Sequence, residues 1–180
     1  MIRQSCHLRP LTADDSAVVW QMLMYAAHES SLEAVKAQPA LVRYAADWGR
    51  LGDLGVGAWV GDMPVGAAWL RLWQGHERGF GFVDERVPEL AIAVLPDFCN
   101  RGMGTQLLRE LLRQASYHYL AVSLSVRANN PCVGLYQRLG FIKMEGSERI
   151  NRTGGISFSM IYQFAPAANV VTPPSKASTP

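Results

Sequence analysis

The amino-terminal half of the chain alternates between strand-like and helix-like spacing of its apolar residues. Residues 3–9 have the pattern of a short strand, and apolar residues at helical spacing predict a helix from about residue 12 to 26. A second helical stretch runs from about residue 32 to 48 and ends in a glycine-rich segment. Two strands at residues 57–60 and 65–72 flank a Gly-Asp-Met-Pro turn, which is typical of a hairpin.

The carboxy-terminal half is built around one continuously apolar segment. Residues 90–95, Leu-Ala-Ile-Ala-Val-Leu, have the composition of a strand that is buried on both faces. The elements predicted after it are a helix over 102–115, a strand over 120–126, a short helix from Pro131 to Gly140, and strands over 141–144 and 157–164. This order of elements indicates an α/β domain with a mixed sheet.

Composition places the chain among globular proteins. With 180 residues, 49% of them apolar, we expect one domain over residues 1–164 and a flexible tail over 165–180, which is rich in proline and serine. A net charge of +2 gives no reason to expect a nucleic-acid or membrane partner. Three scattered cysteines and no long apolar run favour a reducing, cytoplasmic location, and the isolated histidines predict no metal site.

The segment LPDFCNRGMGTQLL, residues 95–108, follows the buried strand with a turn and a helix that begins on Gly102-x-Gly104. The first N–H groups of a helix are unpaired and carry partial positive charge, and glycines let a phosphate approach them. Leu107 stands where a dinucleotide-binding loop has its third glycine, and no Gly-Lys-Ser/Thr is present. This segment alone leaves two interpretations, a pyrophosphate site or a glycine turn leading into a core helix.

A second segment, NNPCVGLYQRLGF at residues 129–141, follows the next predicted strand. Together the two segments resemble the GNAT superfamily of acetyl-CoA-dependent N-acetyltransferases, with its Gln/Arg-x-x-Gly-x-Gly/Ala loop and its Asn-x-x-Ala-x-x-Leu-Tyr-x-x-Leu-Gly-Phe helix. The resemblance spans residues 2–164, and its specific motifs lie in residues 89–141. The chain departs from the pattern at Cys99, Asn100 and Cys132, and Arg101 is placed to supply the positive charge that Cys99 lacks.

The resemblance implies a fold and a cosubstrate. The fold would be a mixed, mostly antiparallel sheet of about six to seven strands, with central strands that splay apart, flanked by about four helices. Acetyl-CoA would bind as cosubstrate without a metal, with its pantetheine arm paired to the backbone of Ile92, Ala93 and Val94. The other cofactor-binding residues that it implies are Cys99, Asn100, Arg101, Gly102, Met103, Gly104 and Thr105 at the pyrophosphate, and Asn129 and Tyr136.

The resemblance also implies two catalytic residues. Tyr136 would protonate the departing thiolate as general acid, and two helical turns would bring its side chain into line with that of Asn129. The alternative for Tyr136 is a packing role with a satisfied hydroxyl. Glu89, at the start of the buried strand, would accept the ammonium proton directly or through water, and its alternative is a solvated strand-end carboxylate. Glu85 and Asp84 are weaker candidates for the base.

The acceptor would be a primary amine, either a small molecule or a peptide, that attacks directly in a ternary complex. The dense tryptophans Trp48, Trp59, Trp69 and Trp73 are expected to be mostly core residues, with one or two available to an acceptor pocket, and Asp53 is a candidate for holding a cationic substrate. Two alternatives stay open: a non-catalytic acyl-CoA-binding or sensory domain of the same fold, and an acetyltransferase of protein amino termini. The oligomeric state also stays open, and it includes a homodimer.

Overall fold

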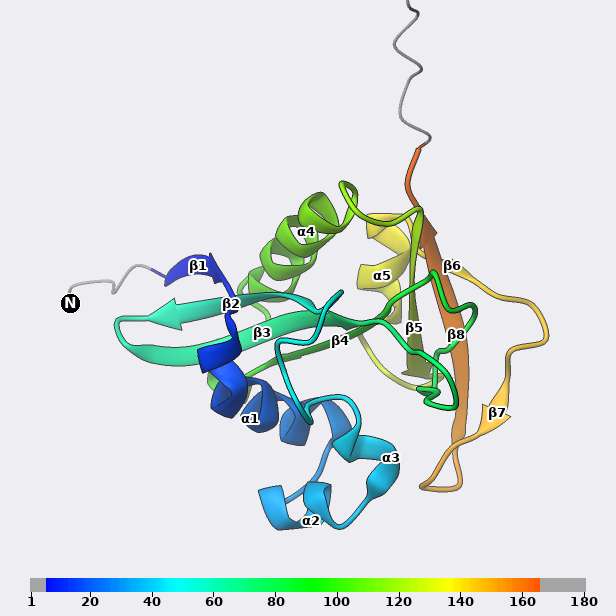
Figure 1. Ribbon diagram of the computed structural model, residues 1–180, viewed down its shortest axis with the longest axis horizontal. Helices are drawn as coiled ribbons and strands as arrows, with labels where there is room; N and C mark the ends of the chain where they lie inside the picture. Colours follow the sequence, from blue (N-terminus) through cyan, green and yellow to red (C-terminus); the bar gives the residue numbers. More distant parts are fainter. Residues whose placement is uncertain (1–5, 166–180) are drawn as a thin grey trace, which may run out of the picture.

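A computed structural model describes residues 6–165 and contains an eight-stranded sheet in the order β1-β2-β3-β4-β5-β8-β6, with β7 paired to β8 (Figure 1). The strands are β1 (Cys6–Pro10), β2 (Leu54–Val60), β3 (Met63–Arg71), β4 (Glu89–Val94), β5 (Ala121–Arg127), β6 (Ile142–Lys143), β7 (Arg149–Ile150) and β8 (Ile156–Gln163). The helices are α1 (Ser16–Ala27), α2 (Leu32–Lys36), α3 (Pro39–Val42), α4 (Met103–Ala115) and α5 (Val133–Leu139), with short 3₁₀ turns at Ala13–Asp15 and Pro96–Phe98. Residues 3–5 of the first predicted strand and residues 166–180 of the predicted tail lie outside the described residues.

The sheet is antiparallel except at its centre, where β4 and β5 run parallel. Their register consists of one residue pair, Glu89 with Ser123, beside a hydrogen bond of 3.0 Å from the Ser123 N–H to the Pro88 carbonyl. Beyond this point the two strands separate, so that β4 continues with β3 and β5 continues with β8. The sheet therefore contains a fork that opens from Glu89 toward the carboxyl ends of β4 and β5.

Each face of the sheet carries its own core. Helices α4 and α5 cover one face and α1, α2 and α3 cover the other (Figure 1). Side chains alternate along a strand, so Leu90 and Ile92 of β4 pack toward α4, and Ala91 and Ala93 pack toward α1. The fork thus lies between two packed layers, and side chains of both layers could contact a ligand bound within it.

The helix predicted over residues 32–48 is instead two short helices followed by turns. Pro39 has no N–H to continue the helix, and it holds Gln38 in an extended conformation with φ −116° and ψ 99°. Gly55, expected to help end that helix, lies inside β2, where an added Cβ would come within 2.6 Å of the Leu11 side chain. Pro39 was not predicted to break the helix, and Gly55 was not predicted to be required by packing within the sheet.

The short helix predicted from Pro131 begins at Val133. The Asn130 side chain accepts a hydrogen bond of 2.8 Å from the Cys132 N–H, and this turn delays the helix by two residues. Strand β7 lies within the segment expected to be a polar loop and pairs with β8 through two residues.

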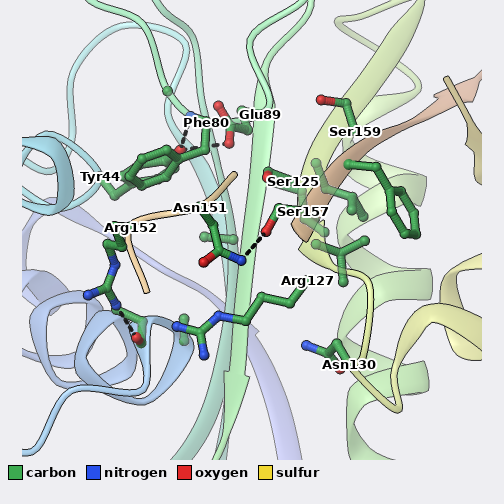
Figure 2. A pocket seen from close by; sticks show the side chains of 18 of the residues that line it. Tyr44, Phe80, Glu89, Ser125, Arg127, Asn130, Asn151, Arg152, Ser157 and Ser159 are labelled. Atoms are coloured by element: carbon green, nitrogen blue, oxygen red, sulfur yellow. Dashed lines mark hydrogen bonds between the residues drawn. The ribbon is translucent and has the colours of Figure 1, made fainter. Parts of the chain in front are cut away.

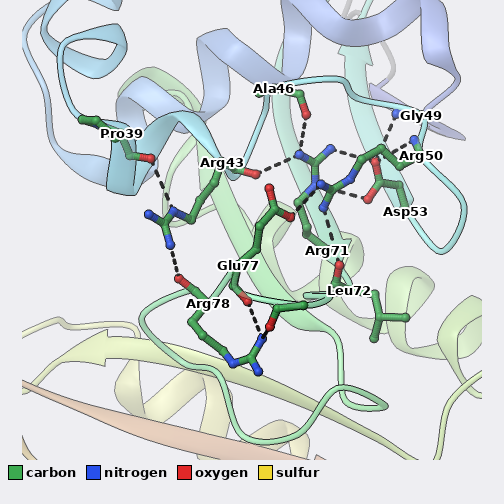
Figure 3. Close-up of polar contacts among 11 residues, drawn as sticks. Pro39, Arg43, Ala46, Gly49, Arg50, Asp53, Arg71, Leu72, Glu77 and Arg78 are labelled. Atoms are coloured by element: carbon green, nitrogen blue, oxygen red, sulfur yellow. Dashed lines mark hydrogen bonds and ion pairs between the residues drawn. The ribbon is translucent and has the colours of Figure 1, made fainter.

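A buried ion pair fixes the segment between α3 and β2. The Arg71 guanidinium and the Asp53 carboxylate are 2.8 Å apart, and the two side chains are only 1% and 2% exposed. Arg71 also donates to the carbonyls of Arg43 and Ala46, and Asp53 accepts from the N–H groups of Gly49 and Arg50 (Figure 3). The prediction that Asp53 holds a cationic substrate is wrong, because Arg71 already occupies its carboxylate.

Breaking this ion pair tests its structural role. We expect Asp53→Ala to lower the free energy of unfolding by about 3–5 kcal/mol, because it leaves the Arg71 cation buried without a counter-charge. Asp62→Ala, in an exposed turn, is the control and should change stability by less than about 0.5 kcal/mol. Urea unfolding of both variants gives the comparison, and a loss below about 1 kcal/mol in Asp53→Ala would contradict the assignment.

Candidate active site

A cavity of about 320 Å³ lies at the fork and reaches both layers of the molecule (Figure 2). Leu23 and Tyr44 line it from the side of α1 and α3, and Tyr136 lines it from α5. Glu89 and Ile92 line it from opposite faces of β4. This volume suits a small ligand, and the lining includes both a buried acid, Glu89, and a buried phenol, Tyr136.

Glu89 is the buried acid of the cavity, with 2% of its surface exposed. Its Oε1 accepts hydrogen bonds from the Tyr44 hydroxyl and the Gly81 N–H, each at 2.7 Å, and its Oε2 accepts one of 2.8 Å from the Trp73 indole. Burial raises the pKa of the Glu89 carboxyl, and the three hydrogen bonds act in the opposite direction. The alternative of a solvated strand-end carboxylate is wrong, because the structure holds this group rigidly inside the protein.

Two glycines bring the loop before β4 against this carboxylate. A Cβ added at Gly79 would lie 2.1 Å from Glu89 Oε2 and 2.6 Å from the Tyr44 hydroxyl oxygen. A Cβ added at Gly81 would lie 2.6 Å from the Leu124 backbone carbon. Tyr44, Gly79 and Gly81 were not among the predicted site residues, although Gly-x-Gly in a polar loop is a signal of close backbone approach.

Tyr136 faces the cavity from the other layer. It is 7% exposed, its ring packs at 68° against that of Phe141, and its hydroxyl has no hydrogen-bond partner among the described residues. Burial is the main cause that raises the pKa of the Tyr136 hydroxyl, and the nearby Cys132 raises it further. This group therefore carries its proton at neutral pH. The alternative of a satisfied hydroxyl does not fit this environment.

The predicted alignment of Asn129 with Tyr136 is wrong. Asn129 is exposed and precedes the first residue of α5 by four positions, so helical geometry does not relate the two side chains. Asn130 lines the cavity instead and lies near Arg127 in Figure 2. The turn formed by the Asn130 side chain is the physical reason for the difference.

The start of α4 has the geometry of an anion site. Gly102 caps the helix with φ +79°, and the N–H groups of Met103, Gly104 and Thr105 have no carbonyl one turn earlier within the helix. A Cβ added at Gly104 would meet only Leu135, at 3.6 Å, so packing within the protein does not require a glycine there. The Met103 side chain is buried in the core, and only its backbone is available to a ligand.

The three residues just before the Gly102 cap of α4 differ in the groups that they could present to a phosphate. Asn100 adopts a left-handed conformation with φ +58°. The Cys99 thiol points back toward the carbonyls of Val94 and Leu95, at 3.6 and 3.5 Å. Arg101 is exposed and forms no ion pair with the described residues, so its charge is available to a phosphate.

The edge of β4 that faces the fork carries alternate backbone groups. The Leu95 N–H donates to Val65 of β3 at 2.9 Å, and the Pro88 carbonyl accepts from Ser123 of β5. Because backbone groups alternate along an antiparallel strand, Ala93 pairs with β3 whereas Ile92 and Val94 face the fork. Of the three residues predicted to hold pantetheine, Ile92 and Val94 therefore turn their N–H and C=O groups toward the fork, where the Val94 carbonyl lies near the Cys99 thiol, and Ala93 does not.

The remaining candidates lie elsewhere. Glu85 pairs with Arg78 at 3.2 Å and Asp84 with Arg86 at 3.0 Å, on an exposed loop. The four tryptophans are at most 8% exposed, as expected for core residues, and do not line the cavity. Trp73 reaches the site indirectly, through its hydrogen bond to Glu89.

Comparison with known proteins identifies the family of this domain. The model of the acetyltransferase (GNAT) domain matches residues 55–143. Similar solved structures include a putative acetyltransferase from Acinetobacter baylyi, at 15% identity over 91% of this chain and 94% of that chain, with a TM-score of 0.69. Another is a putative acetyltransferase from Salmonella typhimurium with its cofactor acetyl-CoA, at 18% identity over 91% and 96% of the two chains and a TM-score of 0.66.

A third similar structure is a ribosomal-protein-alanine N-acetyltransferase from Escherichia coli, at 18% identity over 93% and 99% of the two chains, with a TM-score of 0.64. No curated protein sequence matches the chain. The chain belongs to the GNAT superfamily of acetyltransferases, and the predicted fold, with splayed central strands in a mostly antiparallel sheet, is confirmed. Among the described residues, no helix is long and apolar enough to cross a membrane.

Proposed function

We propose that the protein transfers an acetyl group from acetyl-CoA to a primary amine that attacks directly in a ternary complex. The observation that carries this proposal is the cavity at the fork, which places the Glu89 carboxylate and the Tyr136 hydroxyl in one space. Acetyl-CoA supplies an acetyl group activated as a thioester. The amine has to lose a proton and the thiolate has to gain one, and the two buried side chains suit these two tasks.

The residues at the fork fit this cosubstrate. The start of α4 would hold the pyrophosphate on the N–H groups of Met103, Gly104 and Thr105, with Arg101 beside them. The backbone groups of Ile92 and Val94 that face the fork would pair with the amides of pantetheine. One of these N–H groups would also donate to the thioester carbonyl oxygen, where negative charge develops during transfer.

Glu89 would accept the ammonium proton through water, since its oxygens already accept three hydrogen bonds from the protein. Tyr136 would donate its proton to the thiolate, because the raised pKa keeps the hydroxyl protonated. The alternative of a non-catalytic acyl-CoA-binding domain is disfavoured by Glu89. Burying a carboxylate costs free energy, and cosubstrate binding alone gives no reason for that cost.

The cofactor cradle is tested with two substitutions at Gly104. Gly104→Asp should abolish the rise in melting temperature that acetyl-CoA causes, because it places a carboxylate against the phosphates. Gly104→Ala should raise the stability of the free protein by about 0.5–1 kcal/mol through its helix propensity, yet weaken acetyl-CoA binding. Calorimetric titration measures both effects, and unchanged affinity in Gly104→Asp would show that this helix start does not hold the cosubstrate.

Glu89 is tested through the pH dependence of turnover. A base works only when deprotonated, so activity should fall as pH drops through the raised pKa of Glu89, above its ordinary value of 4.5. Glu89→Gln should lower kcat by about 10²–10⁴-fold and remove this acid limb, with a smaller loss at high pH where free amine is abundant. Glu85→Gln, on the exposed loop, is the matched control. Wild-type turnover in Glu89→Gln across the pH range would assign the proton transfer to another group.

Tyr136→Phe keeps the ring and removes only the proton donor. We expect kcat to fall by about 10²–10⁴-fold, with folding and CoA affinity little changed. Tyr162→Phe, whose ring packs between Phe141 and Phe164, controls for the loss of a phenol elsewhere. A parallel loss of CoA affinity would make the hydroxyl a cofactor contact, and full activity would rule out its role as the acid.

A further inference from the structure

The charges that line the cavity are unevenly distributed. Within the described residues, Glu89 is the acidic side chain of the lining, whereas Arg127, Arg149 and Arg152 are cationic. Figure 2 shows Arg127 and Arg152 at the end of the view opposite to Glu89. The cavity thus combines one anion at the fork with an arginine-rich region away from it.

The arginines differ in what they already bind. Arg152 pairs with Glu29 and donates to the Ala27 carbonyl, so its charge is balanced within the protein. Arg127 is half-buried, and it forms neither an ion pair nor a side-chain hydrogen bond with the described residues. Glu29 lies near enough for Arg127 to help lower the pKa of its carboxyl, but that carboxylate already pairs with Arg152. The hydrogen-bond donors of Arg127 are therefore available to an anionic group on a ligand.

The position of Arg127 separates it from the phosphates of the cosubstrate. Along β5, Val122, Leu124 and Val126 pack toward α4 and α5, where the pyrophosphate cradle lies. Arg127 projects from the other face, together with Ser123 and Ser125. It therefore faces the layer of α1 and α3, from which an acceptor would approach.

Distance along the strand sets the scale of such an acceptor. Ser123 is the register partner of Glu89, and Arg127 lies four residues further, about 13 Å along β5 at the usual rise per residue. The long arginine side chain spans part of this interval, which leaves room for a small molecule between its guanidinium and the fork. Leu23, Ala26 and Leu41 form an apolar wall beside this space.

Resting on the function proposed above, we infer that the acceptor is a small amino acid-like amine whose carboxylate pairs with Arg127 while its amino group faces Glu89. The apolar wall favours an uncharged, aliphatic side chain on this acceptor. The same arginines would repel polycationic amines. His28 also lines the cavity, and its pKa is lowered first by burial and then by Arg127 and Arg152. The two arginines thus disfavour a further positive charge at this end of the cavity.

The test compares an amino acid with analogues that lack its free carboxylate, and with a polyamine and a dipeptide. The CoA released from acetyl-CoA is measured for leucine, leucinamide, 3-methylbutylamine, spermidine and a leucine-initiated dipeptide, and each remaining amino acid is compared with its amide. We expect kcat/KM for the preferred amino acid to exceed that of its amide by about 10²-fold, the usual worth of a charge-assisted pair. Arg127→Ala should erase this preference and Arg127→Lys should restore part of it, whereas Arg86→Ala, which removes a cation from an exposed loop, should leave it unchanged.

Equal or better use of the amides, of spermidine or of the dipeptide would overturn this inference while leaving acetyl transfer intact. If no amine is acetylated, the proposed function fails, and calorimetric titration of N-acetylleucine into the CoA complex then decides the inference separately. Binding that Arg127→Ala weakens by about 10²-fold would support the carboxylate site. Absence of binding would overturn it.

Discussion

The separation of β4 from β5 after a single residue pair is the constraint on which the site depends. A buried strand edge normally pairs its backbone groups, because leaving them unpaired away from water costs free energy. At the fork, the backbone groups of Ile92 and Val94 face the gap that opens between β4 and β5, and Ile92 lines the cavity there. The same separation lets one cavity reach Tyr136 on one layer and Glu89 on the other. The fork thus creates both the proposed binding edge and a cavity shared by the two proposed catalytic side chains.

Holding Glu89 at the fork requires a second set of compensations. Three hydrogen bonds oppose the cost of burying its carboxylate, and their donors lie in the segment after α3, just after β3 and in the loop before β4. The Arg71–Asp53 ion pair secures the segment next to α3 that carries Tyr44. Gly79 and Gly81 allow the loop backbone to approach the carboxylate. The position of the Glu89 carboxylate, the proposed base, therefore depends on residues from four parts of the chain.

The elements with strong local signals were predictable from the sequence. The apolar run of β4, the glycine start of α4 and the Leu-Tyr-x-x-Leu-Gly-Phe helix each depend on neighbouring residues, and they also identified the family. Features that depend on contacts between distant segments were not predictable. The pairing of Asp53 with Arg71, the donation from Tyr44 to Glu89 and the unpaired state of Arg127 arise only when the chain is folded. The error at Asn129 was local, since the Asn130 turn competes with helix formation.

Amide hydrogen exchange at β4, measured by NMR with and without CoA, shows directly whether the cosubstrate enters the fork. We predict that CoA strongly slows exchange at Ile92 and Val94, whose N–H groups face the fork, and leaves Ala93, already paired with β3, unchanged. Slowed exchange at Ala93 alone, or bound CoA with no change at Ile92 and Val94, would contradict the claim that the cosubstrate enters the fork between β4 and β5.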